Sequence, residues 1–282
     1  MDSPNRRNFI KLTAVSLSGL LAARLNINAR PLSNPAHLLN QSDTQETTGL
    51  SQQAATSATN YPYHLSLDGT DDYIEIPNST ELSVAPKGLS VAIEINPAVL
   101  NFPNTEADGY VHFMGKGEGQ GTTGQQEWTF RMYNQNSYRP NRISFYVFNP
   151  DGHIGVGSYF QDVVVAGDWI QVVGVADSTN TYIYKDGEFR DSDQYSGMIT
   201  PKHGTAPVRI GTRDFASYFE GAVRNVRMWN RPLSGQEVAD LYSGTVPTLG
   251  LVAYYPFNID FAFDQLRRHP GSINGATWTP GS

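Results

Sequence analysis

Residues 89–95 read LSVAIEI, and this stretch decides the fold class. Large aliphatic side chains stand at every second position from Leu89 to Ile95, with small or polar residues between them. Successive side chains of a β-strand point to opposite faces of its sheet. The alternation therefore predicts a strand with one buried face and one more polar face.

Similar short runs recur through residues 61–244. They occur at 65–67, 74–76, 128–132, 143–147, 181–189, 208–212 and 222–229. Residues 169–175 (WIQVVGV) are apolar on both faces, which predicts a central strand. Asp186-Gly187 separates two runs and predicts a hairpin turn. Many short strands with turns between them favour an all-β sandwich or a closed sheet.

One short helix is expected near 235–243. Ser234 and Glu237 have the spacing of a capping box, in which each side chain bonds a free backbone NH of the first turn. Gly244 can end the helix in a left-handed conformation. We expect this helix to plug one end of the sandwich.

The composition excludes several classes of protein. The chain has 282 residues, only 17% of them charged, and no cysteine. It can therefore have no disulfide scaffold, cysteine-ligated zinc site or thiol nucleophile. The net charge of −7 argues against nucleic acid as a partner, because phosphate binding needs clustered Lys and Arg.

Residues 1–29 have the layout of an export signal. Arg6-Arg7 precedes Phe9, Lys11 and an apolar run at 12–23, and this order resembles a twin-arginine signal peptide. The run is shorter than the roughly 20 residues that a bilayer requires. We expect export by the twin-arginine route to the periplasm, the medium or the cell surface, with no membrane span after cleavage. Residues 30–60 are polar, lack aromatic residues and predict a flexible linker.

Three motifs together resemble a known family. LSLDGTDDYIEIP (65–77), AGDWIQVVGVAD (166–177) and PVRIGT (207–212) followed by FEGAVRNVRMWNRPLSGQEVADLY (219–242) occur in the order found in laminin G-like domains. These domains belong to the concanavalin A-like lectin/glucanase superfamily. The resemblance implies an antiparallel β-sandwich of the jelly-roll type over residues 61–244, with one short helix near its C-terminal third.

The C-terminal segment is similar to a part of these domains that normally precedes residue 65. It lies at 249–278 in this chain, so the domain is either permuted or followed by a truncated second repeat. Four large aromatic residues favour the first alternative, because a fragment would leave them exposed: Tyr254, Tyr255, Phe257 and Trp278. We therefore expect residues 245–282 to complete the same sandwich as a permuted closing strand.

The superfamily includes glycoside hydrolases, which carry an E-x-D-x-x-E pattern on one strand. Glu106-Ala107-Asp108 begins this pattern, but Val111 stands where the second glutamate belongs. His112 is interpreted as a strand residue, and the glycine-rich stretch at 115–126 as a loop that precedes a strand and not a helix. The sequence therefore predicts a protein that is not an enzyme.

Acidic residues at a strand turn suggest a calcium site. Asp68, Asp71 and Asp72 cluster there, and Asp264 would join them if the C-terminal segment docks beside the turn. The resemblance supports structural calcium, since many laminin G-like domains bind it. The alternative is a solvated turn, and Arg224-Asn225 stands where the family commonly has acidic residues.

The loops supply the candidate sugar-binding residues. Aromatic faces stack on sugars and polar groups bond their hydroxyls, so we select Tyr138, Arg139, Asn141, Asp151, His153, Tyr159 and Phe160. The alternative is that these rings pack beneath the loops.

The prediction is an exported, non-catalytic domain that binds carbohydrate or a surface glycoconjugate. The alternatives are a protein-binding adhesive module at the cell surface, or an unrecognised glycoside hydrolase or polysaccharide lyase.

Overall fold

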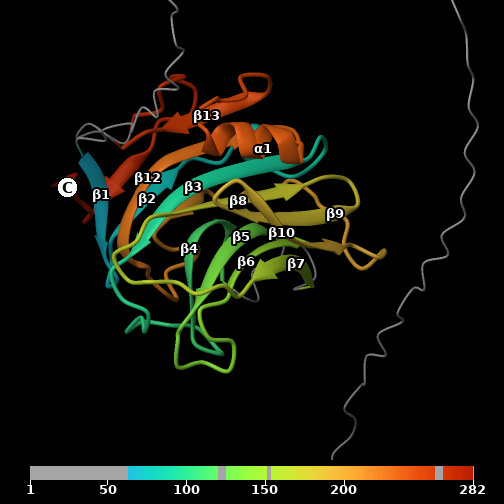
Figure 1. Ribbon diagram of the computed structural model, residues 1–282. Coiled ribbons are helices and arrows are strands. Elements are labelled where there is room, and N and C mark those ends of the chain that lie inside the picture. Colours follow the sequence, from blue (N-terminus) through green and yellow to red (C-terminus); the bar gives the residue numbers. More distant parts are fainter. Residues whose placement is uncertain (1–62, 120–124, 151–153, 258–262, 282) are drawn as a thin grey trace, which may run out of the picture. The chain divides into compact units, whose positions relative to one another are not determined.

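The computed structural model describes residues 63–119, 125–150, 154–257 and 263–281 (Figure 1). They form two antiparallel sheets packed face to face. In hydrogen-bonded order, the first sheet contains β10 (Glu188–Gln194), β9 (Asn180–Lys185), β8 (Ile170–Ala176), β3 (Leu89–Pro97), β12 (Glu220–Trp229), β1 (Tyr63–Asp68) and β15 (Thr277–Pro280), and β13 (Leu251–Tyr255) also pairs with β12. The second contains β14 (Ser272–Asn274), β2 (Tyr73–Ile76), β11 (Val208–Ile210), β4 (Tyr110–Gly117), β5 (Gln126–Tyr133), β6 (Ile143–Phe148) and β7 (Gly155–Phe160).

The expected all-β sandwich is confirmed, and its core lies between the two sheets. The alternating aliphatic side chains of β3 all belong to that core. β8 lies between β3 and β9, as a central strand should. Its Val172 faces the core, whereas Val173 and Val175 pack on the opposite face of the first sheet. The uniform apolarity of β8 therefore reflects a strand that is buried on both faces.

The predicted hairpin turn is also present. β9 and β10 pair on either side of Asp186 and Gly187, whose φ angles are 51° and 80°. A two-residue turn of this kind needs positive φ at both positions, which Asp-Gly accepts at little cost.

The helix has the predicted start but not the predicted position. α1 spans Gly235–Tyr242, and its capping box joins Ser234 and Glu237. The helix does not plug an end of the sandwich. It covers the outer face of the first sheet (Figure 1). Val238 and Leu241 pack there against Val173, Val175 and other buried side chains. This face of the sheet is apolar and needs a cover. Within the described ranges, no helix is long and apolar enough to cross a membrane.

The C-terminal segment contributes strands to both sheets. β13 pairs with β12, β14 with β2, and β15 with β1. Tyr255 and Phe257 are buried in the core, and Trp278 packs against it. The N-terminal and C-terminal ends of the described fold are thus joined by backbone hydrogen bonds.

The interpretation of 115–126 as a loop was wrong at both of its ends. β4 continues to Gly117, and β5 begins at Gln126. The reason is a buried ion pair between Lys116 of β4 and Glu127 of β5. Lys116 also donates to the carbonyl of Ala206 at 2.8 Å. These bonds allow a charged residue to remain within a buried strand.

Candidate functional site

The second sheet has an outer face that points away from the first sheet. On β5, Trp128, Phe130 and Met132 lie in the core, so the alternate residues, including Arg131, lie on the outer face. In the strand register, Arg131 is opposite His112 of β4 and Ser144 of β6. Ser144 is in turn opposite Tyr159 of β7. These four residues form a row across four strands.

Arg131 is surrounded by aromatic rings. Its guanidinium carbon lies 4.6 Å from the ring centroid of Tyr110, 4.8 Å from that of Tyr146 and 5.5 Å from that of Phe148. Cation–π attraction at these distances favours the charged side chain in this half-buried position. The arginine and the rings hold one another in place.

Two glycines of β7 make room for the rings of β6. Tyr146 is opposite Gly157, and Phe148 is opposite Gly155. A Cβ atom at position 155 would lie 2.5 Å from Cε1 of Phe148. The Tyr146 ring can therefore lie against the strand, where it borders a hollow of about 450 Å³. The hollow is also lined by Gly155, Val156, Gly157, Asp193, Gln194, Ser196 and Met198.

A second hollow lies further along β7. Its volume is about 330 Å³, and its lining is Tyr159, Phe160, Gln161, Asp162, Arg190 and Asp191. The backbone NH of Tyr159 donates to Asp191 of β10 at 3.0 Å, which joins the edges of the two sheets. The guanidinium of Arg142 lies 3.8 Å from the ring centroid of Tyr159. Both hollows therefore follow the seam between β7 and β10.

The loop between β5 and β6 adds further aromatic and basic groups. Tyr138 is 63% exposed, and its hydroxyl donates to Asp108 at 2.5 Å. This bond to a carboxylate raises the pKa of Tyr138. Arg139 lies over the rings of Tyr138 and Tyr133, 4.8 and 5.4 Å from their centroids. The exposed ring of Tyr138 is thus held by Asp108 at its hydroxyl and by Arg139 over its ring.

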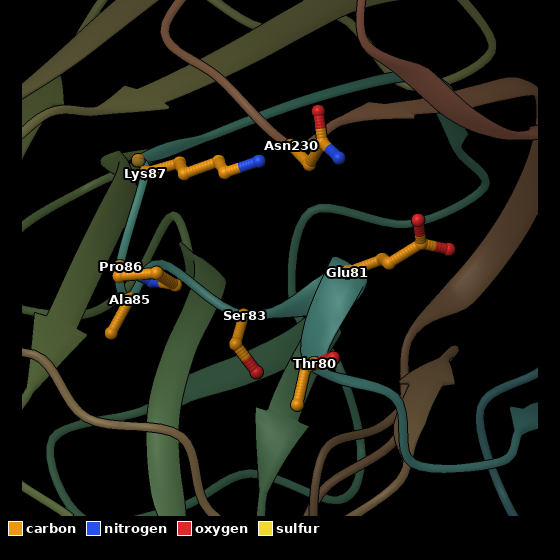
Figure 2. A pocket seen from close by; sticks show the side chains of 8 residues that line it. Thr80, Glu81, Ser83, Ala85, Pro86, Lys87 and Asn230 are labelled. Atoms are coloured by element: carbon orange, nitrogen blue, oxygen red, sulfur yellow. The ribbon is translucent and has the colours of Figure 1, made fainter.

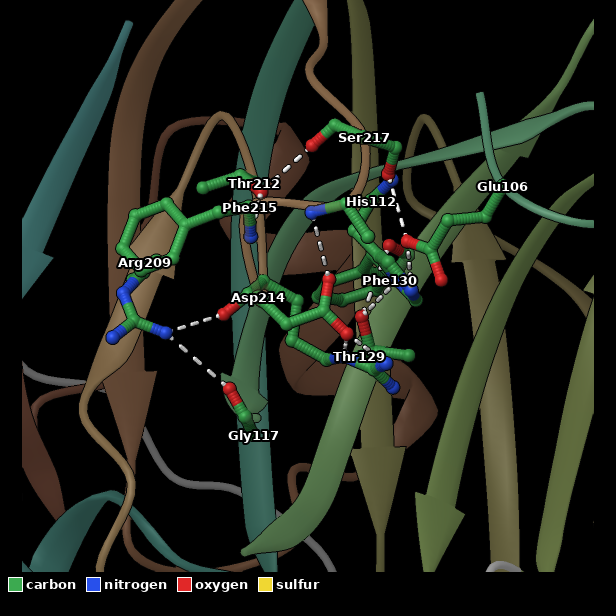
Figure 3. A network of polar contacts seen from close by, with 12 residues as sticks. Glu106, His112, Gly117, Thr129, Phe130, Arg209, Thr212, Asp214, Phe215 and Ser217 are labelled. Carbon is green, nitrogen blue, oxygen red and sulfur yellow. Dashed lines mark hydrogen bonds and ion pairs between the residues drawn. The ribbon is translucent and has the colours of Figure 1, made fainter. Parts of the chain in front are cut away.

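A polar network lies at the β4 end of the row (Figure 3). His112 is fully buried, with Nδ1 2.7 Å from the Thr129 hydroxyl and Nε2 3.1 Å from a Glu106 oxygen. Burial lowers the pKa of His112 well below its usual value, and the charges of Arg213 and Arg131 lower it further. The imidazole is therefore neutral near pH 7.

Asp214 completes this network. Ligand atoms of Glu106, His112 and Asp214 lie within 4.8 Å of one another, a grouping that could hold a metal ion. Asp214 is already engaged by the guanidinium of Arg213, whose Nε lies 3.1 Å away. Ser217 donates to Glu106 at 2.9 Å. These bonds fix the segment that follows β11 over the outer face.

A smaller hollow of about 160 Å³ lies beside η1 (Thr80–Leu82). Figure 2 shows Lys87 extending toward Asn230 across it. Glu81 also borders this hollow, forms an ion pair with Arg268, and has its other carboxylate oxygen 3.2 Å from Nε2 of His269. Because its charge is already paired and the space is small, we place the candidate site on the outer face instead.

Three of the four acidic residues proposed for calcium lie close together in the structure. Carboxylate oxygens of Asp68, Asp71 and Asp72 lie within 4.8 Å of one another, and hard oxygen donors of this kind suit calcium. Burial raises the pKa of Asp72, and the charges of Asp68 and Asp71 raise it further. Asp264 does not share this grouping, because its carboxylate accepts four backbone NH groups of the C-terminal segment.

The structure brings several of the predicted sugar-binding residues to one region. Tyr138, Arg139 and Asn141 lie in the β5–β6 loop, and Arg142 at its end contacts Tyr159. Phe160 borders the hollow of about 330 Å³, but the residue is 4% exposed and belongs to the core. Alternation explains this difference, since neighbouring residues of β7 face opposite ways. Asp151 and His153, like residues 1–62, lie outside the described residues.

Sequence comparison matches residues 68–239 to the concanavalin A-like lectin/glucanases superfamily. The chain belongs to this superfamily. A search of curated proteins found no match.

Two solved structures share the fold of this protein. One is a candidate carbohydrate-binding protein from Bacteroides ovatus ATCC 8483, with a TM-score of 0.53 and 16% identity over 77% of this chain. The match spans only 60% of that protein. The other is the heptameric SAP-like pentraxin from Limulus polyphemus, with a TM-score of 0.54 and 11% identity over 78% of this chain and 95% of the pentraxin.

Sequence reasoning missed Arg131 and Tyr146. Both stand in strands whose core-facing residues were identified, so the alternation placed them on the other face. Gly155 and Gly157, two residues apart, were a further signal, because glycines on one face of a strand make room for a neighbouring side chain. The register that joins these residues is a property of the folded sheet.

Proposed function

We propose that this protein is a non-catalytic carbohydrate-binding protein that holds sugar along the seam between β7 and β10. The observation that carries the proposal is the hollow of about 450 Å³ bordered by Tyr146. Tyr146 is half-buried and supplies an aromatic surface, and the same hollow has the polar side chains of Asp193, Gln194 and Ser196. An aromatic surface beside several polar side chains suits a sugar, whose ring can stack while its hydroxyls form hydrogen bonds.

The similar structures agree with a binding role. One is described as a candidate carbohydrate-binding protein and the other as a pentraxin, and neither description is of an enzyme. Val111, at the position of the second hydrolase glutamate, is buried in the core. The second carboxylate of the hydrolase pattern is thus replaced by a buried apolar side chain, which supports a non-catalytic role.

Export and calcium belong to the same proposal. The twin-arginine pattern at residues 6–11 supports translocation to the periplasm, the medium or the cell surface. Asp68, Asp71 and Asp72 would hold calcium as a structural ion that reduces the repulsion among three neighbouring carboxylates.

A polysaccharide and glycan array tests the proposal. The purified protein is applied in calcium and again with a chelator, together with the variants Tyr146→Ala and Tyr242→Ala. Tyr242 is an exposed tyrosine of α1 and serves as the control. We expect binding to a defined class of sugar that Tyr146→Ala loses and Tyr242→Ala keeps. Absence of binding on a broad array would overturn the proposal and favour a protein partner.

A further inference from the structure

Arg131 is the most unusual polar group of the outer face. A guanidinium carries five NH donors and a permanent positive charge. Among the described residues, the side chain of Arg131 donates no hydrogen bond and forms no ion pair, and its buried Nε has no partner. Buried polar groups are normally satisfied, so this one requires an explanation.

The groups beside Arg131 have the same character. Buried Nε of Arg142 and the Ser144 hydroxyl have no hydrogen-bond partner. Ser144 is directly opposite Arg131 in the sheet. Arg142 makes one long bond of 3.4 Å to Gln161 and otherwise lies over Tyr159. Unsatisfied donors thus gather on one patch, formed by Arg131, Arg142, Ser144 and Tyr159.

Most arginines elsewhere in the described fold behave differently. Six of them form ion pairs with carboxylates: Arg190, Arg209, Arg213, Arg224, Arg231 and Arg268. This is expected in a protein with a net charge of −7. Arg131, Arg139 and Arg142 form none with a described carboxylate, although acidic residues are in excess. Arg227 and Arg267 also form none, but they lie on other parts of the fold, over Tyr254 and Phe263. What distinguishes Arg131, Arg139 and Arg142 is that the charges of all three act on one residue of the outer face, Tyr146.

We infer that the patch recognises the acidic group of a sugar, a uronic-acid carboxylate or a sulfate ester. The inference rests on the proposed carbohydrate-binding function and names the class of sugar. A guanidinium fork matches both groups with two parallel hydrogen bonds. Tyr159 and Tyr146 flank the arginines and supply rings on which the sugar body can stack.

The charges on the two sides of the seam orient such a ligand. Arg131 belongs to β5 and Arg142 is the last residue before β6, whereas Asp191 and Asp193 belong to β10. Both aspartates border the seam hollows. Like charges repel, so the acidic group lies toward the arginines, and neutral hydroxyls lie toward the aspartates.

Binding of matched polymers to the full chain tests this inference. Dextran sulfate is compared with dextran, and polygalacturonate and alginate with a neutral galactan, by calorimetry at two salt concentrations. The variants are Arg131→Gln, Arg131→Lys and Arg142→Gln, with Arg267→Gln as the control. Arg267 is exposed, without a carboxylate ion pair among the described residues, and lies in the C-terminal segment. Circular dichroism checks that each variant is folded. If Arg131→Gln does not fold, Arg142→Gln still tests the inference.

We expect binding to the acidic polymers and little to their neutral counterparts. Arg131→Gln and Arg142→Gln should each weaken binding by about 10- to 100-fold, as for loss of charged hydrogen bonds. Arg131→Lys should recover only part of this loss, and Arg267→Gln should have no effect. Preference for sulfate or for carboxylate polymers identifies the acidic group.

The failures of the two proposals are distinguishable. Equal binding of neutral and acidic polymers, unchanged in the Arg131 and Arg142 variants, would overturn this inference and leave the carbohydrate-binding function intact. An equal effect of Arg267→Gln would also overturn it, because net charge and not the patch would then determine binding. Absence of binding to any polysaccharide would overturn both.

Discussion

Tyr146 of β6 lies against Gly157 of β7, so closely that a Cβ atom at position 157 would be 2.6 Å from Cγ of the tyrosine ring. Phe148 and Gly155 repeat this relationship two cross-strand pairs further along, on the same face. The two glycines thus determine the shape of the outer face at the seam. They let the rings lie beside the hollow that we assign to sugar.

Gly157→Ala tests this relationship. The added methyl group would also lie 2.5 Å from the carbonyl oxygen of Phe145, so the backbone or the Tyr146 ring must shift. We expect a loss of about 1–3 kcal/mol in the free energy of unfolding, measured with denaturant, and weaker sugar binding. Gly119→Ala is the control, because its Cβ would meet nothing within 4 Å. Equal stability of both variants would contradict this account.

The strands could be predicted from the sequence because their two faces differ in polarity. The alternation in β3, β5 and β6 identified the core-facing residues directly. The capping box of α1 and the Asp186-Gly187 turn were equally local signals. Each depends on residues only a few positions apart, so no knowledge of the tertiary structure was required.

The outer-face site could not be predicted in the same way. Arg131, Ser144 and Tyr159 become neighbours only through the register of β5, β6 and β7. The position of α1 was missed for a related reason. The apolar outer face that it covers combines residues of several strands, including Val173 and Trp229. The sequence predicted a site built from loop aromatics, whereas half-buried strand residues form much of the candidate site.

Tyr255→Ala tests the contribution of the C-terminal segment to stability. Tyr255 is fully buried, its ring stacks on Phe257 with centroids 5.9 Å apart, and its hydroxyl donates to the carbonyl of His269. We expect a loss of about 3–5 kcal/mol in the free energy of unfolding. Leu249→Ala, at a residue that is 75% exposed, should change it by less than about 0.5 kcal/mol.

Deletion of 249–282 should unfold or aggregate the protein, and an unchanged melting temperature would contradict this.

Calcium should stabilise the protein through Asp68, Asp71 and Asp72. An ion that binds only the folded state raises the free energy of unfolding, by about 2.7 kcal/mol at 100 times its dissociation constant. We expect a calcium-dependent rise in melting temperature that Asp71→Asn reduces and Asp168→Asn, at an exposed position elsewhere, does not. An equal rise in both variants, or none in the unchanged protein, would exclude calcium binding by this grouping.

The capping box of α1 should make stability depend on pH. Hydrogen bonds from Arg231, and then from Ser234, lower the pKa of Glu237 to about 2 from its ordinary value of 4.5. Because the pKa is lower in the folded state, the ionised carboxylate stabilises the fold above about pH 4.5, and this contribution is lost as pH falls toward 2. We expect Glu237→Gln to be less stable than the unchanged protein at pH 7, with a difference that shrinks between pH 4.5 and 2. Denaturant titrations of both proteins across this range measure it. A difference that stays constant with pH would show that the Glu237 charge does not contribute.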